Sequence, residues 1–213
     1  MSIKIILEKI RKELTEKNKI REDAQKNMRK ATRLSKQAIL LIHQKKLKGA
    51  KKLLEEASEI ISELNDASTA YPRIIYSGLF NAALQEYSEA NILLRLIEEQ
   101  RFITPEEINI PSVDYVLGLA DVIGEYRRLA LDALREGNLK KGEVCLQTMD
   151  EIYTELMGMD EAYMLVPGLR RKCDVDRRII EATRGDITQE VRRSALEKSL
   201  RRVEKHVKEK KKE

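Results

Sequence analysis

Apolar and polar residues recur along the chain with helical spacing, in long segments separated by short links that contain proline or glycine. The first segment, from about residue 3 to residue 46, contains neither breaker and predicts one long helix. A second helix is expected from about residue 51 to residue 64, after Gly49. Long helices joined by short links are typical of a helical bundle. The first helix has a small, apolar face formed by Ala24, Met28, Ala31, Ala38 and Ile42.

Turn and capping residues predict the remaining helices. Thr104 and Glu107 have the spacing of a capping box, which predicts a short helix before Ile110-Pro111. The longer segments are predicted from Tyr71-Pro72 to about residue 100, from Ser112 to about residue 136, from Gly137-Asn138 to about residue 157, from Pro167-Gly168 to Arg184-Gly185, and from Thr188 to about residue 205.

The composition supports an all-α fold, here an elongated antiparallel bundle of about six to seven helices. Of 213 residues, 42% are hydrophobic and 36% charged, with nine glycines, four prolines and no tryptophan, a balance that favours helix over strand. We expect one domain over residues 1–191 and a basic helix or tail over residues 192–213. That tail is interpreted either as solvated or disordered, or as an arm that grips nucleic acid.

The chain lacks the uninterrupted apolar run of a membrane span and the core of a signal peptide. Its two cysteines, Cys145 and Cys173, lie far apart without metal-ligand spacing. A soluble, cytoplasmic protein is therefore expected.

The segment from about residue 72 to residue 100 combines an apolar stripe with acidic residues. Glu86 lies in the stripe by helical spacing, and Glu89 follows one turn later. Ser88 is placed on the opposite, polar face. Asp150 lies at the margin of an apolar stripe on a later helix, so three acids are candidates for one site. The apolar members of the first stripe are Ile75, Leu79, Ala82, Leu93 and Ile97.

A site built from carboxylate oxygens alone suits Mg²⁺ or Mn²⁺, which would support cleavage of a phosphodiester by activated water. Glu-x-x-Glu pairs are nevertheless common in such charged helices, where ion pairs to Lys or Arg are the usual explanation. The sequence has no glycine-rich phosphate loop, serine-nucleophile elbow or Cys/His nucleophile, which argues against nucleotide-driven motors and acyl-transfer hydrolases.

A basic stripe on the first predicted helix is a candidate for binding a phosphate backbone, although a solvated helix face explains it equally well. Its members are Lys19, Lys26, Arg29, Lys30, Arg33 and Lys36. Two weaker candidates lie elsewhere. Glu125 is spaced for ion pairs with Arg128 beside Asp121, and a structural role is favoured there. Another basic patch consists of Arg170, Arg171 and Lys172.

Two motifs carry a family resemblance. Residues 84–90 read Leu-Gln-Glu-Tyr-Ser-Glu-Ala, and residues 113–121 read Val-Asp-Tyr-Val-Leu-Gly-Leu-Ala-Asp. Both resemble the translin family, and most closely its catalytic branch, translin-associated factor X. The resemblance covers about residues 20 to 190. The chain lacks the long insert that factor X proteins carry between positions equivalent to Ile108 and Val113.

The resemblance implies that Glu86, Glu89 and Asp150 form the acidic triad for RNA cleavage and hold Mg²⁺ or Mn²⁺. It also implies a hollow octamer whose interior chamber holds single-stranded nucleic acid or a short duplex, with a homo-oligomer as the simpler assembly. The sequence therefore predicts a metal-dependent endoribonuclease. A non-catalytic binder of single-stranded DNA or RNA and a helical adaptor protein are the alternatives.

Overall fold

The computed structural model describes residues 2–159, 161 and 163–210. Within these residues the chain is all helical, as predicted, and contains no strand. Its contacts separate it into two compact units that divide between Val122 and Ile123, within the fifth helix. The helices are α1 (Ile3–His43), α2 (Leu47–Ala70), α3 (Pro72–Ile75), α4 (Gly78–Glu99), α5 (Ser112–Arg135), α6 (Leu139–Met157) and α7 (Leu169–Lys210).

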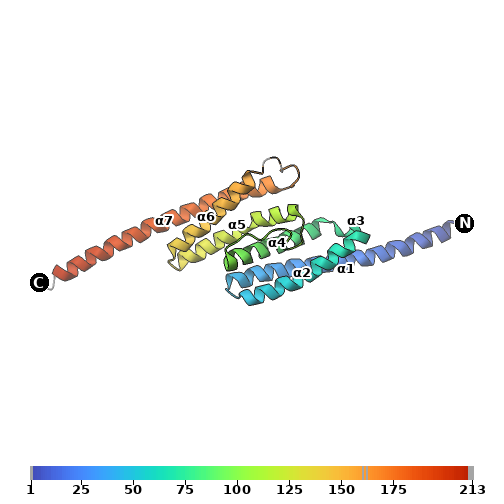
Figure 1. Cartoon of the computed structure of the whole chain (residues 1–213), viewed down its shortest axis with the longest axis horizontal. Helices are drawn as coiled ribbons and strands as arrows, with labels where there is room; N and C mark the ends of the chain where they lie inside the picture. The colour runs from blue at the N-terminus through green and yellow to red at the C-terminus, as the bar shows by residue number, and fades with distance from the viewer. Residues whose placement is uncertain (1, 160, 162, 211–213) are drawn as a thin grey trace. The chain divides into compact units, whose positions relative to one another are not determined.

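The first unit is built on α1, α2 and α4. The chain turns at Gln44–Lys46, so that α2 folds back along α1, and α4 packs against both helices (Figure 1). The predicted apolar face of α1 is the face that is buried. Because three of its residues are alanines, neighbouring helices approach this face closely.

Helix α4 is the most enclosed element of the first unit. Every residue from Tyr87 to Leu94 is buried, which includes Ser88 and Glu89. Two expectations about its faces were wrong: Ala82 is exposed, whereas Ser88 is fully buried. Since α4 has neighbours on several sides, a single apolar stripe does not describe its buried surface.

The motif at residues 113–121 holds the start of α5 against α4. Gly118 lies so close to α4 that a Cβ atom there would stand 2.6 Å from Ser88 Cβ and 2.7 Å from the Gln85 carbonyl oxygen. Gln85 also hydrogen-bonds to Asp114, while burial raises the pKa of that carboxyl group. Tyr115 Oη donates to the Ile103 carbonyl at 2.5 Å. The motif therefore has a packing role in this unit.

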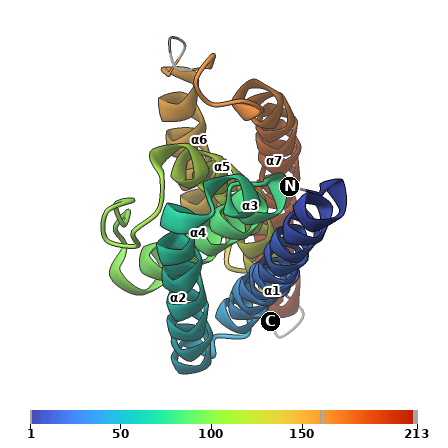
Figure 2. The ribbon, with the colours of Figure 1, turned by 90° about the vertical axis from the view of Figure 1, so that its right-hand side faces the viewer.

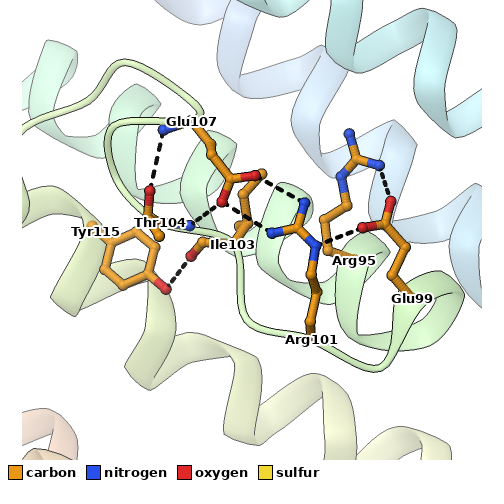
Figure 3. A network of polar contacts seen from close by, with 7 residues as sticks. All are labelled: Arg95, Glu99, Arg101, Ile103, Thr104, Glu107 and Tyr115. Carbon is orange, nitrogen blue, oxygen red and sulfur yellow. Dashed lines mark hydrogen bonds and ion pairs between the residues drawn. The ribbon is translucent and has the colours of Figure 1, made fainter.

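The loop between α4 and α5 is held by a charged network (Figure 3). The Arg101 guanidinium contacts Glu99 at 2.7 Å and Glu107 at 2.8 and 3.0 Å. Thr104 N–H donates to Glu107 at 2.8 Å, and Glu107 N–H donates to Thr104 Oγ1 at 3.4 Å. The capping-box contacts are thus present, but they close turns where a short helix was expected. Asn109, with φ of 51°, is incompatible with helix continuation there.

Several helix boundaries differ from the expectation. The segment predicted as one helix from Tyr71-Pro72 is interrupted at Tyr76–Ser77, where both residues are extended. Gly49 lies inside α2, and α7 continues through Gly185 and past the predicted boundary at residue 191. Thr188 does not cap a new helix, because its hydroxyl donates to the Arg184 carbonyl at 2.7 Å, one turn back in the same helix.

The second unit pairs α6 with α7, which run side by side (Figure 2). The buried residues of this unit include Met149 and Ile152 of α6, and Ile180 and Ile187 of α7. Arg127 of α5 donates to Thr183 Oγ1 of α7 at 2.7 Å. None of the helices within the described residues has the length and apolar character needed to cross a membrane.

Candidate functional site

The predicted basic stripe lies on the side of α1 away from its buried face. Five of its six residues are exposed, and Lys30 is half-buried. Lys30 forms an ion pair with Glu56 of α2 at 2.6 Å, so its charge is used within the unit. Lys19, Lys26, Arg29 and Arg33 present their charges to solvent over more than three helical turns.

Three residues of the stripe line an open hollow of about 450 Å³. These are Arg29, Arg33 and Lys36, with Leu40 of the same helix and Leu79 of α4 contributing apolar surface. Thr32 and Gln37 add polar groups that sequence reasoning did not select. A hollow with cations around an apolar floor suits a ligand that carries a phosphate next to an apolar ring or sugar face.

Glu86 lies beside this stripe. Its carboxylate contacts Lys36 Nζ at 3.1 Å, which joins α4 to α1, and the Glu86 side chain keeps 25% of its exposure. The candidate acid and the candidate phosphate-binding cations are therefore neighbours within the first unit. An ion pair this exposed contributes little to stability, so both groups can exchange their partners at small cost.

Glu89 is in a different environment although it is only one turn away. Just 8% of the residue is exposed, within the most buried stretch of α4. It takes part in a polar or electrostatic interaction in the protein. A buried carboxylate requires compensation by donors or cations. Glu89 is therefore not explained as a residue of a solvated helix face.

Asp150 belongs to the second unit. It lies half-buried on α6, and Arg184 Nη2 of α7 contacts both of its carboxylate oxygens, at 2.9 and 3.2 Å. Arg184 was treated in the sequence only as a helix end. No local pattern identifies it as a partner of Asp150, because the two residues are 34 positions apart.

The described residues contain no group of three or more His, Cys, Asp or Glu side chains arranged to hold a metal ion. The donor chemistry of the three candidate acids nevertheless fits Mg²⁺ or Mn²⁺, since all their ligand atoms are carboxylate oxygens. Glu86 and Glu89 stand one turn apart on one helix. Their carboxylates form the better-defined part of a candidate site, and Asp150 remains a predicted third ligand.

The weaker candidates are placed as follows. Glu125 is half-buried on α5 and takes part in a polar or electrostatic interaction. Arg170 and Arg171 are exposed at the start of α7, whereas Lys172 is half-buried and interacts with other groups. Both cysteines are buried and free, and burial raises the pKa of each thiol, which disfavours the reactive thiolate.

Comparison with known proteins places this arrangement in a family. An uncharacterized protein of Methanocaldococcus jannaschii is 36% identical over 193 residues, which cover 90% of this chain and 85% of that protein. The crystal structure of AfC3PO is 36% identical with a TM-score of 0.76, covering 86% of this chain and 96% of that one.

Two further solved structures are similar. The complex of AfC3PO with duplex RNA is 35% identical with a TM-score of 0.76, covering 86% of this chain and 95% of that one. The structure of apo-NeC3PO is 25% identical with a TM-score of 0.77, covering 86% and 96%. The Translin family model matches residues 19–208. The chain belongs to the Translin family.

Proposed function

We propose that this protein binds RNA through the basic stripe of α1 and cleaves it as a metal-dependent endoribonuclease within a hollow homo-oligomer. The observation that carries the proposal is the contact between Lys36 and Glu86, which places a candidate metal ligand beside the candidate phosphate-binding surface. A similar protein, AfC3PO, has been solved with duplex RNA.

In this proposal Arg29, Arg33 and Lys36 hold phosphate oxygens at the hollow on α1. Glu86, Glu89 and Asp150 hold Mg²⁺ or Mn²⁺, which supplies an activated water and charge stabilisation at the phosphate. Single-stranded RNA and a short duplex both present this backbone. Single-stranded DNA does so too, and is a further candidate ligand.

The alternative is a binder without turnover. It is favoured by the cations that pair with two of the acids, Lys36 with Glu86 and Arg184 with Asp150, since such pairs neutralise the carboxylates without a metal. On this alternative the acids are structural, and substituting them leaves all RNA functions unchanged.

The deciding experiment uses a labelled RNA with Mg²⁺ or Mn²⁺, and follows cleavage and binding in parallel. Glu86→Gln/Glu89→Gln and Asp150→Asn should abolish cleavage while binding is kept, and a chelator should do the same. Glu63→Gln, at an exposed carboxylate of α2, is the matched control. Tight binding by the wild type without cleavage under these conditions would support the non-catalytic alternative.

A further inference from the structure

Two helical arms carry apolar stripes that no other part of their own unit covers. All residues from 2 to 19 are exposed at the start of α1, and all residues from 195 to 210 are exposed at the end of α7. In Figure 1 each arm continues its helix past the other helices of its unit. A helix of this length is marginal in water without packing, so a stripe of large apolar residues on each arm calls for a partner.

The two stripes have the same spacing. The N-terminal stripe contains Ile3, Leu7, Ile10 and Leu14, which are 68%, 57%, 44% and 59% exposed. The C-terminal stripe contains Leu196, Leu200, Val203 and Val207, which are 60%, 54%, 61% and 47% exposed. Each stripe advances by four, three and four residues, which is the seam of a coiled coil. On the C-terminal arm the stripe is narrower than the apolar face of a helix that packs on a core or lies on a membrane, whereas Ile5 and Ile6 add exposed apolar surface beside the N-terminal stripe.

The flanking charges select which arms can pair. On each arm, one edge of the stripe is formed by the residues that directly follow the first and the third stripe residue, which is the same heptad position in both arms. This edge carries Lys4 and Arg11 on the N-terminal arm, and Glu197 and Glu204 on the C-terminal arm. Two antiparallel N-terminal arms would place Lys4 against Arg11, and two antiparallel C-terminal arms would place Glu197 against Glu204. Each antiparallel self-pairing therefore brings like charges together.

An antiparallel pair of one N-terminal and one C-terminal arm matches both the apolar stripes and the charges that flank them. When Ile3 is set opposite Val207, every stripe residue faces an apolar residue: Leu7 meets Val203, Ile10 meets Leu200, and Leu14 meets Leu196. In this register Lys4 lies beside Glu204, and Arg11 lies beside Glu197. The other edge brings Glu13 beside Ser199 and Ile6 beside His206, with no like charges.

We propose that the N-terminal arm of one copy forms an antiparallel coiled coil with the C-terminal arm of a second copy. The register ends after Leu14 and Leu196, since the next layer would set Lys17 against Arg193. The pairing does not rest on RNA cleavage. It also uses a segment that precedes the residues matched by the family model.

Disulfide trapping tests the pairing and its register in the full-length chain. Leu7→Cys in one tagged copy and Val203→Cys in another should give an inter-copy disulfide, because these residues face each other. Leu14→Cys combined with Val203→Cys is the register control, since those positions are offset by about 10 Å along the helix. The native cysteines are buried and are left in place.

Charge reversal tests the selection of arms. Lys4→Glu/Arg11→Glu, or Glu197→Lys/Glu204→Lys, each places like charges beside the seam and should lower the trapped yield by roughly tenfold. Combining all four substitutions should restore it. Because all four substituted residues are exposed, these variants should remain folded. Failure of the combination to restore trapping, or equal trapping in the register control, would each overturn the proposal.

Discussion

The guanidinium of Arg184 on α7 holds the carboxylate of Asp150 on α6, with contacts of 2.9 and 3.2 Å to its two oxygens. Both side chains keep substantial exposure, at 47% and 39%. A pair of this kind adds little to stability, but it occupies the oxygens that a metal would require. Arg184 therefore competes with any cation for Asp150.

Replacing Arg184 by glutamine should tighten Mn²⁺ binding, because Asp150 is released from its guanidinium partner. The free energy of unfolding should change by less than about 1 kcal/mol. Calorimetric Mn²⁺ titration and urea unfolding measure the two effects. Arg193→Gln, which removes ion pairs to Glu190 and Glu197 on the same helix, is the matched control. An unchanged Mn²⁺ affinity in the Arg184 variant would remove Asp150 from the proposed metal ligands.

A second prediction concerns the close approach of α5 to α4. Gly118→Ala should destabilise the protein by about 1–3 kcal/mol, since its Cβ would lie 2.6 Å from Ser88 Cβ and 2.7 Å from a backbone oxygen. Gly185→Ala has no atom within 4 Å of its Cβ and lies inside α7, so it should stabilise by about 0.4–1 kcal/mol. Urea midpoints compare the two. Equal effects would show that helix packing at Gly118 tolerates a side chain.

These positions also show how far the sequence predicts the structure. The buried face of α1 follows from its own periodicity, so Ala24, Met28 and Ala31 were identified correctly. The burial of Ser88 depends on the approach of Gly118 from another helix, which no local pattern reveals. The continuity of α7 through Gly185 is likewise not revealed by a local pattern. A glycine costs a helix only about 1 kcal/mol, and the packing of α7 on both sides of Gly185 outweighs that cost.

The sequence likewise predicted one part of the candidate site and not the other. The exposure of the basic stripe was predictable, because its residues lie opposite the buried face of one helix. The contacts of Lys36 with Glu86 and of Arg184 with Asp150 join different helices and required the structure. The assignment of the acids to a metal remains a prediction.

The loop network predicts a pH dependence. The neighbouring Arg101 guanidinium, with help from the Thr104 N–H, lowers the pKa of Glu107 from 4.5 to about 2. Because folding lowers this pKa, the contribution of Glu107 to stability is complete above about pH 4.5 and is lost as the pH falls through about 2. Glu107→Gln should therefore lower the melting temperature at pH 7, and the difference from wild type should shrink below pH 4.5. Glu106→Gln, at the exposed neighbour, is the control. A difference independent of pH would mean that Glu107 acts through packing.

If the basic stripe binds RNA, the affinity for RNA should depend on salt concentration through its cations. Arg29→Ala/Arg33→Ala removes two cations from the hollow on α1 without opening the buried face of that helix. Affinity should fall for all RNA sequences alike, and the slope of log affinity against log salt should become shallower by roughly one unit for each phosphate that is no longer neutralised. Lys48→Ala/Lys52→Ala removes the same charge from exposed positions of α2 and separates local contact from net charge. Titrations of a labelled RNA at several salt concentrations provide the slopes. If both double variants change the slope equally, the RNA responds to total charge and the stripe is not the binding surface.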